Sequence, residues 1–313
     1  MRRLVLSQGD PDGVGPELLL RLASCGALRS GDLVVAGHAN LRRLVERLSS
    51  SPAASWATSG WRTIVPLLLP SASQELGQVE ALTLAVDHVL ASPGWGLVTA
   101  PIDKAACMAQ GFAHAGHTEY LAQRAGATDV AMVMVGPTLR VALATVHIPL
   151  SEVSRRLDVA SVVRAGTRLV EALRGIFGVQ VPRVGVLGLN PHAGEKGVLG
   201  DEEARIVGPA IAALSRKLGP QAQFLGPLPA DTAFPHHAAG RYDGLVGMYH
   251  DQALGPFKLL HFRDGVNLTM GLPFIRTSPD HGTAKDIAGR GEADPASMLC
   301  AIRLARGESK VFG

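Results

Sequence analysis

Three histidines occupy similar positions in the sequence, each shortly after an apolar segment with the character of a strand. His147 follows VALATV, His192 follows VGVLGL, and His250 follows GLVGMY. In parallel sheets, ligands gather at the carboxyl ends of the strands, where loops carry the chemistry. Three imidazoles that leave one position open form a catalytic metal site, and nitrogen donors favour zinc over magnesium. The sequence therefore predicts a three-histidine metal site.

The alternative for each histidine is a structural residue that is hydrogen-bonded at the end of its strand. No HExxH or HxH spacing connects the three. Asp251, next to His250, is a candidate acceptor for the ring nitrogen that faces away from a metal. The candidates for a general base are Asp231, Asp251 and a metal-bound hydroxide.

Two loops could bind a phosphate or another anion. The glycine-rich segment Gly9–Glu17 lies between a strand and a helix, but it lacks a complete GxGxxG pattern and a P-loop lysine, so it could equally be a tight turn. In Gly116-His117-Thr118-Glu119, Thr118 could cap the following helix, and the backbone N–H groups would suit an anion. His117 could add a donor there.

Arg276 lies in the apolar segment GLPFIRTS. A guanidinium in such surroundings needs an anionic partner, because an unpaired buried charge is costly. That partner could be a substrate carboxylate or phosphate, or a structural ion pair with Asp280 or Asp286. Lys258 could be a phosphate donor or a solvated helix residue.

The composition limits the class of protein. Hydrophobic residues make up 47% and charged residues 18% of the chain, so it can bury a sizeable core. A net charge of +3 without a basic tract, and an aromatic content of 4%, argue against nucleic-acid binding. The three cysteines form no CxxC pair, and apolar runs such as Ala131–Val135 are too short to span a bilayer. We expect a cytoplasmic protein without nucleic-acid or membrane partners.

Apolar segments alternate with helical patterns, which predicts an α/β fold with a largely parallel sheet. We expect strands at Leu4–Leu6, Asp32–Gly37, Gly96–Thr99, Arg183–Leu187 and Gly244–Met248, and a hairpin of Val130–Val135 and Leu139–Ala144. We expect helices at Pro16–Ala27, Leu41–Leu48, Gln78–Leu90, Val159–Ile176, Glu202–Leu218 and Ser297–Arg306. Ser49–Ser59, rich in Ser and Ala, is expected to be a mobile surface loop.

Seven short motifs occur in a fixed order between residue 9 and about residue 291. They are GDPDGVGPE, TAPIDKAA, GHTEYLA, NPHAGE, PLPADTAF, YHDQ and GLPFIRTSPDHGTAKDIAGRG. Together they resemble the 4-hydroxythreonine-4-phosphate dehydrogenase family of vitamin B6 (pyridoxal phosphate) biosynthesis. The resemblance covers nearly the whole chain, and seven ordered motifs are far more specific than any one of them.

The resemblance implies a fold like that of isocitrate and isopropylmalate dehydrogenases, with two α/β domains and an active-site cleft between them. We expect residues 1–125 with 280–313 to form the first domain. Residues 126–279 would form the second, with the metal ligands and the dimer interface. The resemblance also implies a homodimer with the active site at the interface, in which the partner subunit donates the third histidine.

The resemblance also implies roles for individual residues. It places a divalent metal on the three histidines, with zinc foremost and magnesium or cobalt as alternatives. It implies NAD, or NADP, without a Rossmann fingerprint, and leaves the cofactor-binding residues unassigned. The substrate contacts that it implies are His117, Thr118, Lys258, Asn267 and Arg276.

The implied reaction is the oxidation of 4-phosphohydroxy-L-threonine, a small phosphorylated hydroxy amino acid. The product, 2-amino-3-oxo-4-phosphooxybutanoate, decarboxylates to 3-amino-2-oxopropyl phosphate. Asp12 and Asp103 depart from the residues common in the family, and both would add negative charge near candidate anion-binding loops.

Three alternatives stay open. The first is a related dehydrogenase that acts on phosphorylated threonate or erythronate, or on a cis-dihydrodiol acid. His117, Thr118 and Arg276 favour a phosphorylated, carboxylated substrate over the dihydrodiol. The second is a three-histidine metal hydrolase without a nicotinamide cofactor, and the third is a non-catalytic anion-binding protein.

Overall fold

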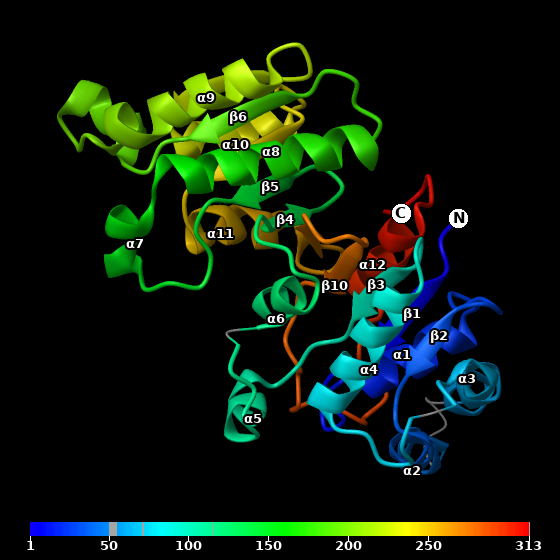
Figure 1. Cartoon of the computed structure of the whole chain (residues 1–313). Helices are drawn as coiled ribbons and strands as arrows, with labels where there is room; N and C mark the ends of the chain where they lie inside the picture. Colours follow the sequence, from blue (N-terminus) through cyan, green and yellow to red (C-terminus); the bar gives the residue numbers. More distant parts are fainter. Residues whose placement is uncertain (50–54, 71, 115, 313) are drawn as a thin grey trace. The chain divides into compact units, whose positions relative to one another are not determined.

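The computed structural model describes residues 1–49, 55–70, 72–114 and 116–312, and the chain divides into two compact units (Figure 1). Unit 1 comprises Met1–Ala127 and Leu272–Gly313, and unit 2 comprises Thr128–Gly271. The return to unit 1 lies at Leu272 and not at residue 280, because strand β10 pairs with β3 of unit 1.

The described residues of unit 1 form four strands in the order β2-β1-β3-β10, and their pairings are parallel. The strands are β1 (Leu4–Ser7), β2 (Leu33–Val35), β3 (Gly96–Thr99) and β10 (Arg276–Pro279). Successive side chains of a strand point to opposite faces of the sheet. Val5 and Leu97 therefore pack with α4 (Gln78–Ala91), and Gly96 lies on the other face, against Leu4 and α12 (Ala296–Arg306).

Six further helical elements belong to the described part of unit 1. They are α1 (Gly15–Ser24), α2 (His38–Ser49), α3 (Trp56–Ile64), the 3-10 turn η2 (Val65–Leu67), α5 (Lys104–Ala109) and α6 (His117–Arg124). Gly60 of α3 allows close packing on α1, because a Cβ there would lie 2.3 Å from the carbonyl oxygen of Leu20.

Unit 2 has six strands in the order β9-β4-β5-β8-β6-β7. They are β4 (Ala131–Val135), β5 (Arg140–Leu143), β6 (Arg183–Leu187), β7 (Gln223–Leu228), β8 (Gly244–Gly247) and β9 (Val266–Met270). β4 pairs antiparallel with β5, which confirms the predicted hairpin, and it also pairs antiparallel with β9. The pairs β5–β8, β8–β6 and β6–β7 are parallel, so these strands end at one edge.

Helices cover both faces of the unit 2 strands (Figure 1). Leu245 of β8 packs in one core with Phe234 and Phe257, whereas the neighbouring Gly244 meets Leu169 of α8 on the opposite face. The helical elements are α7 (Leu150–Arg156), α8 (Val159–Gly175), η3 (Pro191–Gly197), η4 (Glu203–Val207), α9 (Gly208–Leu218), α10 (Ala230–Ala238) and α11 (His250–His261).

Two predicted elements differ from the structure. The expected helix Glu202–Leu218 begins as the π-helical turn η4 and becomes regular only at α9. The expected loop Ser49–Ser59 is partly helical, because α2 continues to Ser49 and α3 begins at Trp56, while residues 50–54 lie outside the described residues. Within the described residues, no helix has both the length and the apolar composition for crossing a membrane.

Candidate functional site

The three histidines follow three neighbouring parallel strands of unit 2. His147 comes after β5, His250 begins α11 directly after β8, and His192 lies in η3 after β6. β8 lies between the other two strands, and Leu143 of β5 is level with Gly247 of β8. The sequence thus places all three residues at one edge of the sheet, where the carboxyl ends of its parallel strands meet.

His147 and His250 lie side by side in unit 2. Their ring centroids are 5.9 Å apart and the rings are tilted by 43°. Two imidazoles on one tetrahedral zinc have centroids about 5 Å apart, as follows from Zn–N distances of about 2 Å. The two rings also line a pocket of about 240 Å³. The residues that line it are Val146, His147, Ile148, Leu150, Val153, Tyr249, His250 and Asp251.

His250 is oriented by its neighbour in the sequence. Its Nδ1 lies 2.7 Å from Oδ1 of Asp251, which is the kind of carboxylate partner that fixes a ligand imidazole and directs its Nε2 at a metal. Among the described residues, no group of three or more His, Cys, Asp or Glu side chains could hold a metal ion. One chain therefore brings two of the predicted ligands together, and His192 does not join them.

A side chain that the sequence analysis did not single out joins the ends of β8 and β6. Gln252 accepts a hydrogen bond from the Met248 N–H at 2.7 Å and donates one to the Gly188 carbonyl at 2.8 Å. On the other side of β8, the Thr145 hydroxyl donates to the Met248 carbonyl at 2.6 Å. The three histidine-bearing loops therefore start from strand ends that are fixed to one another. Gln252 belongs to the YHDQ motif, and this was its only signal in the sequence.

The loop that carries His192 has an unusual backbone. Residues 192 to 196 all have left-handed angles, with φ of 52° and ψ of 28° at His192. Only Gly194 adopts this region without penalty, and each of the other four costs roughly 1–2 kcal/mol. The loop therefore carries about 4–8 kcal/mol of local strain by that rule. Such strain persists only where surrounding contacts hold the chain in place, and it is concentrated at functional sites.

Unit 1 holds a separate group of cationic and polar side chains. Arg276 is 2% exposed, and its guanidinium donates to the Thr99 hydroxyl at 2.7 Å. Burial lowers the pKa of Arg276 to about 10, while Glu119 acts in the opposite direction, so the side chain stays charged at neutral pH. Arg276 belongs to β10, but its guanidinium lies next to Thr99, the last residue of β3. A buried cation in this place suits an anionic ligand.

His117 belongs to the same group. Burial, and then the charges of Arg276 and Lys104, hold the pKa of His117 well below its usual value of 6.5. The ring is therefore neutral at neutral pH, and its buried Nε2 has no hydrogen-bond partner among the described residues. An orphaned buried nitrogen beside two cations is the arrangement expected where a ligand supplies the missing partner.

The prediction that Thr118 caps the helix is wrong. Helix α6 begins at His117 with Gly116 at the N-cap position, so Thr118 lies within the first turn. Its place near a helix N-terminus still suits a hydrogen bond to an anion.

The other predicted residues of unit 2 differ in their surroundings. Asn267 lies in β9, and its buried Oδ1 has no hydrogen-bond partner among the described residues. Lys258 is half-buried on α11. Asp231 is exposed in the first turn of α10, and the side chain of Asp251 is 91% exposed. Asp251 already bonds His250, so its geometry fits the orienting role, and Asp231 is left as the candidate base.

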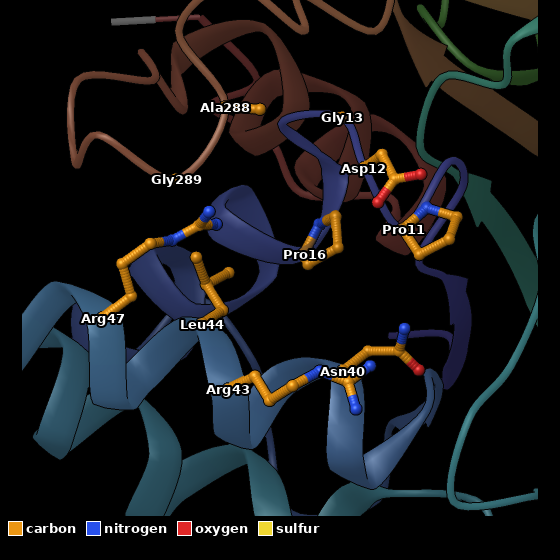
Figure 2. A pocket seen from close by; sticks show the side chains of 10 residues that line it. All are labelled: Pro11, Asp12, Gly13, Pro16, Asn40, Arg43, Leu44, Arg47, Ala288 and Gly289. Atoms are coloured by element: carbon orange, nitrogen blue, oxygen red, sulfur yellow. The ribbon is translucent and has the colours of Figure 1, made fainter.

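The glycine-rich loop of unit 1 borders a pocket of about 340 Å³ (Figure 2). Arg43 and Arg47 extend from α2 on one side, and Asp12 lies on the other side. Arg43 also pairs with Glu75 at 2.5 Å. Two guanidinium groups and a volume within the range of small-molecule sites could accommodate the phosphates of a dinucleotide. The residues that line the pocket are Pro11, Asp12, Gly13, Pro16, Asn40, Arg43, Leu44, Arg47, Ala288 and Gly289.

Glu17, the last residue of the GDPDGVGPE motif, holds one wall of this pocket. Its buried carboxylate accepts hydrogen bonds from the N–H groups of Gly289 at 3.0 Å, Gly291 at 3.2 Å and Ala293 at 2.9 Å. Arg21 adds its guanidinium, which also donates to the Gly291 carbonyl. Glu17 therefore fixes α1 to the loop before α12 through these hydrogen bonds.

The two acidic departures from the family pattern have different surroundings. Asp103 caps α5 by accepting from the Ala106 N–H at 3.0 Å, and it pairs with Lys285 at 2.5 Å. The Lys285 ammonium and the Ala106 N–H hold the pKa of Asp103 below its usual value. Lys285 also reaches Asp10 at 3.0 Å, so one ammonium is shared by two carboxylates and offsets only part of their negative charge. Asp12 is exposed and lines the pocket of Figure 2.

Known proteins resemble this chain over nearly its whole length. The family model described as pyridoxal phosphate biosynthetic protein PdxA matches residues 58–305. The 4-hydroxythreonine-4-phosphate dehydrogenase of Desulfosudis oleivorans is 43% identical over 334 residues, which cover 98% of this chain and 96% of that protein. The crystal structure of the enzyme of that name from Klebsiella pneumoniae superposes with a TM-score of 0.79 at 36% identity, covering 97% of both chains.

More distant structures bear on the fold and on the alternatives. A terephthalate 1,2-cis-dihydrodiol dehydrogenase from Burkholderia xenovorans LB400 is similar with a TM-score of 0.64 at 28% identity, covering 98% of both chains. An isocitrate dehydrogenase from Methylococcus capsulatus gives 0.51 at 15% identity, over 99% of this chain and 87% of that one. The predicted α/β fold of the isocitrate dehydrogenase type is therefore confirmed.

Proposed function

This chain belongs to the PdxA family of pyridoxal phosphate biosynthetic proteins, and we propose that it oxidises 4-phosphohydroxy-L-threonine with NAD. It is an oxidoreductase, as its relatives are. The observation that carries the proposal is the position of three histidines after three adjacent parallel strands, in a chain 43% identical to a 4-hydroxythreonine-4-phosphate dehydrogenase.

We propose that His147, His192 and His250 hold a divalent metal, zinc before magnesium or cobalt, because imidazole nitrogen is a poor ligand for magnesium. The neighbouring rings of His147 and His250 support this, as does the carboxylate of Asp251 behind His250. When bound, the metal would act as a Lewis acid on the substrate hydroxyl and on the carbonyl that replaces it.

The other side chains position the substrate and the proton. Arg276 supplies a permanent positive charge for the phosphate or the carboxylate, and the neutral ring of His117 supplies a hydrogen bond. Lys258 and the orphaned oxygen of Asn267 are further candidates for polar contacts. When bound, NAD would supply the hydride acceptor for the carbinol carbon, while the hydroxyl proton would leave to a base, for which Asp231 is the candidate. The resulting β-keto acid then loses carbon dioxide.

An assay of NADH formation tests this proposal. With 4-phosphohydroxy-L-threonine and NAD, the protein should form NADH, and a chelator should abolish the rate until zinc is restored. Phosphorylated threonate and phosphorylated erythronate serve as competing substrates, and NADP as the competing cofactor. Faster turnover of either competing substrate would reassign the substrate, and phosphate release without nicotinamide would favour a hydrolase.

We also propose a homodimer in which a second copy completes the metal site. The exposed residues at the end of α11 support this, because Leu259, Leu260 and Phe262 are 84%, 54% and 68% exposed. Large apolar side chains gathered on one surface typically mark an interface. His147 and His192 are exposed as well.

The dimer predicts a result for Phe262→Asp. A carboxylate in place of the ring should raise the dimer dissociation constant by at least about tenfold, as for a buried aromatic anchor. Sedimentation equilibrium measures this, with the exposed Val181→Asp as the matched control. A fully active monomer in the unmodified protein would contradict the proposed dimer.

A further inference from the structure

The strained loop of His192 begins next to a buried carboxylate that has no part in the proposed reaction. Glu203 lies in η4 and is only 7% exposed. Its Oε1 accepts hydrogen bonds from the Leu189 N–H and from the Asn190 N–H, both at 2.8 Å. Its Oε2 accepts from the Asn190 side-chain amide at 3.0 Å. One carboxylate therefore binds three donors at the beginning of the loop.

Two glycines of the loop pack closely against this carboxylate. A Cβ on Gly188 would lie 2.9 Å from Oε1 of Glu203, and a Cβ on Gly194 would lie 2.5 Å from Oε2. Both separations are shorter than a carbon and an oxygen tolerate. The loop thus contacts the carboxylate both before and after His192, and a side chain at either glycine would displace the loop or the carboxylate.

The protonation state of Glu203 agrees with this arrangement. Burial alone raises the pKa of Glu203, but the hydrogen bonds from Asn190 and Leu189 outweigh burial, and the pKa is below its usual value. The group is therefore an anion at neutral pH. A buried anion is tolerated where several N–H donors satisfy it.

We propose that Glu203 is a positioning residue that fixes the backbone of residues 188–194 and thereby directs His192 at the metal. The inference rests on the proposed metal site. Glu203 touches neither the substrate nor the cofactor in this proposal, and it acts through the loop. Partners behind metal ligands typically change metal affinity by about 10–100-fold when they are replaced.

Zinc affinity and loop mobility test the proposal in the full-length protein. Glu203→Ala should weaken Zn²⁺ binding, measured by competition with a chelating dye, by about 10–100-fold. It should also alter the visible spectrum of the Co²⁺-loaded protein and speed amide exchange in residues 189–197 of the metal-free protein. Glu203→Gln keeps one oxygen for the Leu189 and Asn190 N–H groups, so it should restore most of the affinity.

Two controls separate this inference from the metal site and from general destabilisation. Glu171→Gln changes an exposed carboxylate that pairs with Arg168 on α8, and it should leave all three measurements unchanged. His192→Ala tests the metal site itself. If His192→Ala loses zinc while both Glu203 variants keep wild-type affinity and spectrum, the positioning role is wrong. Unchanged exchange in residues 189–197 of Glu203→Ala would overturn it even if the metal site failed.

Discussion

Replacing His192 with Ala is expected to remove the bound metal and the turnover together. A structural zinc site with four ligands gives roughly 10–16 kcal/mol of binding free energy, so an equal share for one ligand is about 2.5–4 kcal/mol. Metal affinity should therefore fall by about 10²–10³-fold. Metal content after dialysis, measured by atomic spectrometry, and the rate of NADH formation check both effects on one sample.

His236→Ala is the matched control for this experiment. His236 is an exposed histidine of unit 2 on α10, away from the three predicted ligands in the sequence. It should keep its metal and its activity. His147→Ala should behave like His192→Ala, because its ring lies next to that of His250. Full metal content in His192→Ala would contradict the three-histidine site, whatever its activity.

The sequence predicted the regular parts of this fold well, because hydrophobic periodicity determines them. The strands Gly96–Thr99 and Arg183–Leu187 were predicted with the bounds that the structure has. The failures fall where periodicity carries no information. Glu202–Leu218 keeps its apolar pattern through η4, yet the first turn is π-helical. Leu272–Pro279 returns to unit 1, which only strand pairing reveals.

The sequence predicted where the three histidines lie relative to the strands, but not the contacts that surround them. Each histidine follows an apolar strand, and the apolar segment before it is visible in the local sequence. The hydrogen bond from Gln252 to Gly188 joins residues 64 positions apart, and no local sequence pattern indicates such a pair. The carboxylate of Glu203 is likewise recognisable only once η4 lies against the loop after β6. Sequence patterns therefore single out candidate groups, whereas the contacts that orient these groups depend on the folded chain.

Arg276→Ala is expected to raise the Michaelis constant for the phosphorylated substrate strongly while leaving the metal bound. A hydrogen bond to a charged group contributes about 1.5–3 kcal/mol, so the loss of two such bonds to one anion raises the constant by about 10²–10⁴-fold. Steady-state kinetics over a range of substrate concentrations measure this, and metal analysis provides the second readout. The buried position of Arg276 makes a folding check by thermal unfolding necessary.

Arg276→Lys separates the charge from the shape of the guanidinium. Lysine keeps the positive charge but cannot make the forked contact or reach the Thr99 hydroxyl in the same way. We expect an intermediate Michaelis constant with a nearly unchanged maximal rate, because the interaction exists in the ground state as well as in the transition state. If Arg276→Ala folds and keeps the Michaelis constant of the unmodified protein, then the buried cation is structural, and the anion is held elsewhere.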